Sequence, residues 1–105
     1  MGSIASITRP ADFRAVLADG ERSGGRGMTV YVRRSQENGP RLGLVVKASG
    51  SVTRNRVKRR LRAAARAAGP AVGTDVVIRA DDRAAGRDFQ EMVAIVKGAL
   101  EGGGR

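Results

Sequence analysis

The chain has 105 residues, enough for one small domain, and it contains no Cys and no His. These absences exclude disulfides, cysteine nucleophiles and imidazole-based metal or acid–base sites. The formal net charge is +10, and residues 22–66 hold thirteen of the twenty Lys and Arg residues but only one of the ten acids. A cationic centre in a near-neutral chain is typical of a protein that binds a polyanion.

The N-terminal part of the chain predicts a loose tail followed by a short helix. Residues 1–7 lack the basic and apolar stretches of a signal peptide, and no apolar run in the chain is long enough to span a membrane. We therefore expect a cytoplasmic protein without a membrane partner. A helix is expected from a cap at Thr8 to a stop at Gly20, and residues 21–27 form a flexible stretch with room for a short edge strand.

The central part of the chain reads as two strands. Residues 28–34 alternate in polarity, which places Tyr31 and Arg33 on one side of a strand. Residues 35–40 contain an Asn-Gly pair that favours a turn, and residues 41–47 form a second apolar strand. Together these segments predict a β-hairpin.

The C-terminal half predicts a helix, a strand and a final helix. Residues 54–68 are rich in Arg, Ala and Leu, which are strong helix formers, and a Gly-Pro pair follows them. Residues 74–79 read as a strand, residues 81–86 as a polar loop and residues 87–100 as an amphipathic helix. Residues 101–105 read as a second loose tail.

These elements predict a single domain over residues 1–105. The order helix, hairpin, helix, strand, helix is typical of the α+β class. We expect a small two-layer α/β sandwich with three helices and a central, mostly antiparallel sheet of about four strands.

The helix at 54–68 carries the strongest functional signal. At about 100° per residue, Val57, Leu61 and Ala64 form one apolar stripe that predicts a buried face. The rest of the circumference is basic, with no acid to relieve the repulsion. Bound phosphates would neutralise such an arc, whereas the plainer alternative is a solvated basic surface. The polar residues of the arc are Asn55, Arg56, Lys58, Arg59, Arg60, Arg62 and Arg66, with Arg54 over the first turn.

The roles of three further residues, Asn55, Tyr31 and Phe13, each allow two interpretations. Asn55 could bind a base edge or a sugar hydroxyl, or could belong to the helix N-terminus. Tyr31 beside Arg33 could be a stacking platform for single-stranded bases or a half-buried strand tyrosine. Phe13 could belong to the core or to a stacking surface. No set of residues predicts a catalytic centre or a metal site, so any reactive groups are expected elsewhere.

At the start of the basic helix, Arg54-Asn55-Arg56-x-Lys58-Arg59 resembles the RNR motif of the bacterial ribonuclease P protein family. The resemblance extends over roughly residues 8–100. It includes the Asp-Phe pair within residues 11–20 and the strands at 41–46 and 74–80.

The resemblance implies a left-handed βαβ crossover through the basic helix and a catalytic RNA subunit that uses Mg²⁺ to cleave precursor tRNA at its 5′ end. It implies no cofactor on the protein itself and no obligate protein partner. By this resemblance the face toward ribonuclease P RNA comprises Arg54, Asn55, Arg56, Arg59, Arg60 and Arg66. The cleft for the single-stranded 5′ leader would comprise Phe13, Leu17, Tyr31, Arg33, Lys47, Lys58 and Arg62.

The sequence also departs from the family pattern. The segment 47–53 is about two residues shorter than usual and keeps Lys47 as its one basic residue, and Leu17 stands where a second aromatic is common. Two other functions remain open: a general RNA-binding chaperone or ribosome-associated protein, and a nuclease in its own right. The lack of His and of paired carboxylates disfavours the nuclease.

Overall fold

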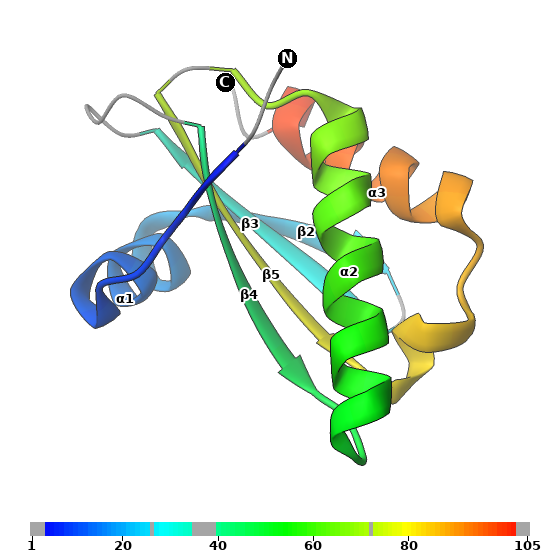
Figure 1. The fold of residues 1–105 in the computed structure, drawn as a ribbon. Helices are drawn as coiled ribbons and strands as arrows, with labels where there is room; N and C mark the ends of the chain where they lie inside the picture. Colours follow the sequence, from blue (N-terminus) through cyan, green and yellow to red (C-terminus); the bar gives the residue numbers. More distant parts are fainter. Residues whose placement is uncertain (1–3, 26, 35–39, 72, 103–105) are drawn as a thin grey trace.

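The computed structural model describes residues 4–25, 27–34, 40–71 and 73–102. Figure 1 shows one twisted sheet with helix α1 on one face and helices α2 and α3 on the other. The predicted α+β sandwich with three helices is therefore confirmed. The elements are β1 (Ala5–Ser6), α1 (Pro10–Asp19), β2 (Glu21–Gly25), β3 (Met28–Arg34), β4 (Arg41–Lys47), α2 (Ser51–Ala68), β5 (Thr74–Asp81), the 3₁₀ helix η1 (Asp82–Gly86) and α3 (Phe89–Gly102).

The sheet has five strands in the order β1-β4-β5-β3-β2. Strands β1 and β4, and β4 and β5, pair in parallel, whereas β3 pairs antiparallel with both β2 and β5. The sheet is thus mixed and has one strand more than predicted. The predicted hairpin of residues 28–34 with 41–47 is wrong, because β5 lies between these two strands. The predicted turn at 35–40 falls outside the described residues except for Pro40.

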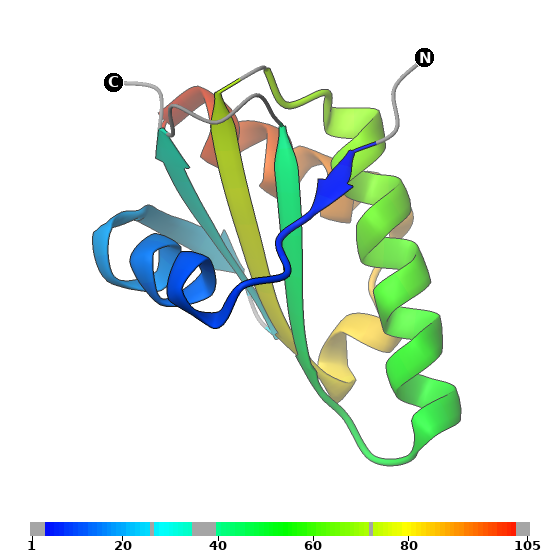
Figure 2. The same ribbon diagram turned by 60° about the vertical axis from the view of Figure 1, so that its left-hand side comes forward.

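Helix α2 connects two neighbouring parallel strands, β4 and β5. Viewed from the α1 side in Figure 2, both strands run downwards, β5 lies to the left of β4 and α2 lies behind the sheet, so the crossover is left-handed. Nearly all such crossovers are right-handed. The left-handed connection expected from the resemblance is therefore present, and it carries the basic helix along the β4 side of the molecule.

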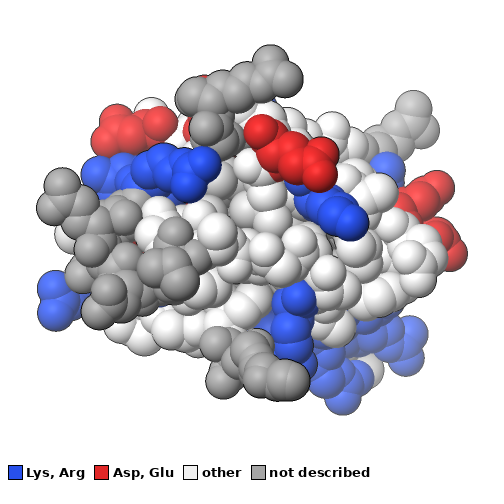
Figure 3. Space-filling view, turned by 90° about the horizontal axis from the view of Figure 1, so that it is seen from above, with Lys and Arg blue, Asp and Glu red and all other residues white. Residues whose placement is uncertain are grey.

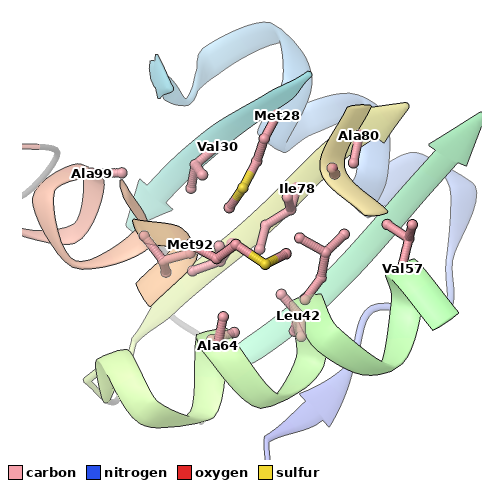
Figure 4. Packing of buried hydrophobic residues seen from close by; sticks show 14 of the residues in the cluster. Met28, Val30, Leu42, Val57, Ala64, Ile78, Ala80, Met92 and Ala99 are labelled. Carbon is pink, nitrogen blue, oxygen red and sulfur yellow. The ribbon is translucent and has the colours of Figure 1, made fainter. Parts of the chain in front are cut away.

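The main core lies between the sheet and the two helices α2 and α3. Figure 4 shows Val57 and Ala64 of α2, Met92 of α3, and Leu42 and Ile78 of the sheet pointing toward one another. All five are buried. The apolar stripe predicted for α2 is thus confirmed, and it fixes which side of the helix faces solvent.

Several element ends differ from prediction. Helix α2 begins at Ser51, three residues earlier than expected, and ends at Gly69, whose φ of +71° is a left-handed cap. Helix α1 is preceded by Arg9 rather than Thr8, with no side-chain cap.

The predicted loop at 81–86 is largely η1, since that helix occupies Asp82–Gly86. The tail predictions are wrong for residues 5–7 and 101–102, because β1 and the buried Ile7 occupy the first segment and α3 extends through the second. Residues 1–3 and 103–105 lie outside the described part. Among the helices that the model describes, none combines the length and the apolar character that crossing a bilayer requires.

Candidate nucleic-acid interface

The solvent-facing side of α2 is a continuous cationic surface. Val57, Leu61 and Ala64 turn to the core and are fully buried, so the opposite side of the helix faces solvent. In the end-on view of Figure 3, one group of blue atoms lies at the margin where α2 stands, and no red atoms lie beside it; further blue and red groups lie elsewhere on this face. We call the exposed residues of this surface the outer arc: Arg54, Asn55, Arg56, Arg59, Arg62 and Arg66.

The outer arc has little internal neutralisation. Helix α2 contains no acidic residue, and within the described part of the chain Arg56, Arg59 and Arg66 form no ion pair. Arg54 donates one hydrogen bond of 3.3 Å to the carbonyl of Ala48. Asn55 lies in the second turn and is exposed, so it does not cap the helix. An array of unpaired guanidinium groups on a rigid element suits bidentate binding of phosphates.

Arg60 differs from its neighbours on the same helix. It is half-buried, and its guanidinium donates to the carbonyls of Ala84 (3.3 Å), Ala85 (2.9 Å) and Arg87 (2.6 Å). These bonds connect the middle of α2 to η1 and the start of α3. Sequence reasoning placed Arg60 with the RNA-facing cations, whereas both of its terminal nitrogens donate hydrogen bonds within the protein.

The opposite face of the sheet holds a second, smaller core under α1. Ile7, Val16, Tyr31 and Val77 are buried here, and Tyr31 is only 7% exposed. Phe13 and Leu17 of α1 are half-buried and pack against this cluster. Gly43 lies directly beneath the Phe13 ring, because a Cβ on Gly43 would lie 2.6 Å from two ring carbons.

An ion-pair network anchors α1 to the sheet. Asp75 is fully buried and accepts two hydrogen bonds from Arg41, at 2.9 Å and 2.7 Å, in a bidentate arrangement. Arg41 also donates to Asp12 of α1 at 3.2 Å. The hydrogen bonds from Arg41 to Asp75 are the largest cause that raises the pKa of Arg41 above its ordinary value. Arg41 therefore belongs to the framework rather than to a binding surface.

Beyond α1, the same face of the sheet opens into a cleft of about 350 Å³. We call it the sheet-face cleft. Strands β3, β4 and β5 supply its floor, and the start of η1 supplies one side. Among the residues that the structure describes, three cations and one acid line it, and their charges sum to +2. Its lining residues are Gly25, Gly27, Met28, Thr29, Val45, Lys47, Arg79, Ala80, Asp81 and Arg83.

The residues predicted for a leader cleft are distributed over several places. Lys47 lines the sheet-face cleft, and Arg33 lies at the far end of β3, 3.9 Å from Asp19. Lys58 and Arg62 belong to α2, which packs on the face opposite α1, and neither lines the sheet-face cleft. On the helix they lie across the buried stripe from Arg60. The structure thus brings only part of the predicted set together.

Sequence reasoning missed Arg79, an exposed residue on the cleft floor. The sequence pattern could have placed Arg79 on this face, because Arg79 follows Val77 by two positions on one strand and alternate residues of a strand share a face. Val77 lies in the core under α1, so the same face continues outward through Arg79. Arg83 of the cleft rim was also missed, since η1 was expected to be an irregular loop.

Comparisons with known proteins agree with this architecture. The model of the Ribonuclease P family matches residues 1–102. The ribonuclease P protein component of Acidothermus cellulolyticus is 42% identical over 94 residues, which cover 84% of this chain and 78% of that protein. The corresponding protein of Mycolicibacterium gilvum is 46% identical over 65 residues, covering 57% of this chain and 52% of its relative.

Solved structures share the fold. The ribonuclease P protein of Staphylococcus aureus superposes with a TM-score of 0.75 at 21% identity, with 94% of each chain covered. That of Thermotoga maritima gives a TM-score of 0.69 at 23% identity, covering 86% of this chain and 89% of that one. Together with the family match and the basic helix in its crossover, these findings show that the chain belongs to the ribonuclease P protein family.

Proposed function

We propose that this chain assists the 5′ maturation of precursor tRNA by binding two RNAs at two separate surfaces. The outer arc of α2 binds the catalytic RNA of ribonuclease P, and the sheet-face cleft binds the single-stranded 5′ leader of the substrate. The observation that carries the proposal is the separation of two cationic surfaces by the sheet, since α2 packs on one face and the cleft opens on the other.

In this proposal the RNA subunit performs the hydrolysis and holds the Mg²⁺ that the reaction needs. Asp81 of the cleft lining and its chain neighbour Asp82 support this assignment, because both carboxylates accept hydrogen bonds within the protein. Asp81 accepts hydrogen bonds from the Arg83 side chain, the shortest at 2.7 Å, and Asp82 accepts from the backbone N–H of Ser49 at 2.9 Å. Neither carboxylate is free to act as one of an acid–base pair. The reaction is assigned to the cytoplasm, with no protein partner required.

Reconstitution tests the proposal. The chain is mixed with a bacterial ribonuclease P RNA and precursor tRNA at low Mg²⁺, and 5′ processing is measured. We expect faster processing than with RNA alone and none with RNA-free protein. A general RNA chaperone would bind these RNAs without a preference for precursor over mature tRNA, and cleavage by the protein alone would contradict the assignment of catalysis to RNA.

The contribution of the outer arc is tested with Arg56→Ala combined with Arg59→Ala. Each charge-assisted phosphate contact contributes about 1.5–3 kcal/mol, so the double variant should bind the catalytic RNA at least roughly a hundredfold more weakly. The control is Lys97→Ala, which removes one charge from an exposed position on α3. An equal loss of binding free energy per charge removed in both variants would mean that only net charge matters.

A further inference from the structure

The floor of the sheet-face cleft is a row of side chains set by the register of three strands. Thr29 of β3 pairs with Arg79 of β5, which pairs in turn with Val45 of β4. One row further, Lys47 pairs with Asp81. Because alternate residues share a face, Lys47 and Val45 project from the same side of β4. Arg79 therefore stands in the middle of the floor, with Lys47 diagonal to it.

The aromatic residues Tyr31 and Phe13 of this face do not line the cleft. Tyr31 lies in the neighbouring row of the sheet, where it is 7% exposed within the small core. Phe13 lies over Gly43 in that same row, and its ring packs against the core cluster. Neither residue lines the cleft. Stacking of a base needs an exposed aromatic face, and none of the described lining residues is aromatic.

The cations of the cleft are available. Arg79 and Lys47 are exposed, and neither forms a hydrogen bond or an ion pair in the part of the chain that the structure describes. The one acid in the lining, Asp81, is neutralised by the Arg83 side chain through contacts of 2.7 Å and 3.2 Å. Among the described lining residues, the cations without an acidic partner are therefore Arg79 and Lys47.

The floor is also open toward the edge of the sheet. Gly24 of β2 pairs with Thr29, next to Arg79, and has no side chain to stand over the row. A Cβ on Gly24 would lie 2.4 Å from the carbonyl oxygen of Met28, so the position holds only glycine without local rearrangement. A polymer backbone can therefore approach the sheet closely at this end of the row.

We propose that Arg79, together with Lys47, forms a phosphate-binding site on the floor of the sheet-face cleft. A single-stranded leader is held there through its backbone, and its bases are not stacked by the protein. This inference rests on the proposed function and adds the chemistry by which the cleft recognises its ligand. Recognition of this kind tolerates any leader sequence, since phosphates carry no base identity.

The test uses the full chain assembled with a ribonuclease P RNA, and it compares three precursor tRNAs with a short leader. One leader is natural, one has abasic nucleotides and one has uncharged methylphosphonate linkages. For the wild-type protein, the abasic leader should bind about as tightly as the natural one. The methylphosphonate leader should lose roughly tenfold or more in affinity.

Arg79→Gln supplies the second arm, with Arg79→Lys as the conservative variant and Lys97→Gln as a control that removes one exposed charge elsewhere. Arg79→Gln should weaken binding of the natural precursor about tenfold and leave mature tRNA, which lacks a leader, unchanged. The slope of log affinity against log salt should fall by about 0.7. Arg79→Lys should recover most of the affinity.

Two results would overturn the inference. A loss of roughly 5- to 150-fold with the abasic leader would show base stacking. Unchanged precursor binding by Arg79→Gln, while the wild-type complex prefers precursor over mature tRNA, would remove Arg79 from the site and leave the proposed function intact. The proposed function itself fails if the wild-type complex shows no such preference.

Discussion

The two faces of the sheet use the same strands for different purposes. Toward α2 and α3, alternate residues such as Val30 and Ile78 build a continuous buried core. Toward α1, the intervening residues build a small core around Val77, with an ion-pair network on one side of it and an open cationic cleft on the other. Because side chains alternate along a strand, one face can supply most of the stability while the other exposes charge.

Two arginines on the second face illustrate the difference. Arg41 bonds two acids and is mostly buried, with 16% of its side chain exposed. Arg79 lies two rows away, exposed and without a partner among the described residues. The partner residues, rather than the arginine itself, determine whether a cation belongs to the framework or to a binding surface.

The largest effect is expected when the framework on the α1 side is broken. Asp75→Ala would leave the Arg41 guanidinium mostly buried and without its bidentate partner. Loss of one member of a buried pair costs about 3–5 kcal/mol, which urea denaturation would measure. The matched control is Asp19→Ala, whose pair with Arg33 is exposed and 3.9 Å long, and which should cost less than about 1 kcal/mol. Similar losses of unfolding free energy in Asp75→Ala and Asp19→Ala would contradict the distinction between the buried and the exposed ion pair.

A smaller effect is expected at the contact between α1 and the sheet. In Gly43→Ala the new methyl group would meet the Phe13 ring, and overpacking of this kind costs about 1–3 kcal/mol. In the double variant Gly43→Ala with Phe13→Leu, the smaller side chain at position 13 should restore part of the lost stability. Gly98→Ala is the control, since a Cβ there has nothing within 4 Å, and alanine in an exposed helix stabilises by about 0.5–1 kcal/mol. Equal stability changes in both glycine variants would refute the contact.

Much of the fold could be predicted from periodicity, because the spacing of apolar residues along the chain is a local property of the sequence. The stripe of α2 predicted the correct buried residues, and the alternation of residues 28–34 predicted the strand β3. Strand pairing could not be predicted in this way. The chain returns through the left-handed crossover, so β5 enters between two strands that are neighbours in sequence.

The candidate site could be predicted only in part. The helical wheel places Lys58 and Arg60 at similar angles on opposite flanks of the stripe. Only the tertiary structure shows that η1 presents carbonyls to Arg60. The burial of Tyr31 likewise depends on α1 packing over its strand. These contacts join distant parts of the chain, and no local pattern encodes them.

The neighbours Arg59 and Arg60 offer a sharper comparison within one helix. Arg60→Ala removes three hydrogen bonds to carbonyls and should lower the free energy of unfolding by about 1–2 kcal/mol. Arg59→Ala should change stability by less than about 0.5 kcal/mol. Affinity for the catalytic RNA should show the reverse order. Only Arg59→Ala should reduce the salt slope, by about 0.9 if its phosphate lies on a duplex. A reduced slope for Arg60→Ala would identify Arg60 as an RNA ligand.

The smallest expected effect concerns Asp81 and Arg83 at the rim of the cleft. The Arg83 side chain, followed by its backbone N–H, holds the pKa of Asp81 below its ordinary value. A carboxyl group whose folded pKa is lowered stabilises the protein at pH values above its unfolded pKa. That contribution is lost as the pH falls through the folded pKa. The pair is exposed, so the change in stability should be slight.

The direct measurement is an NMR titration of Asp81 in the wild type and in Arg83→Ala. The variant keeps the backbone N–H, so the pKa of Asp81 should rise only part of the way to its ordinary value. Above that pKa the variant would leave an unneutralised carboxylate beside Arg79 and Lys47. Precursor tRNA should then bind more weakly at neutral pH, with part of the loss recovered in Asp81→Asn combined with Arg83→Ala. An unchanged titration of Asp81 in Arg83→Ala would show that the pair does not form in solution, and the cleft would then carry a free acid.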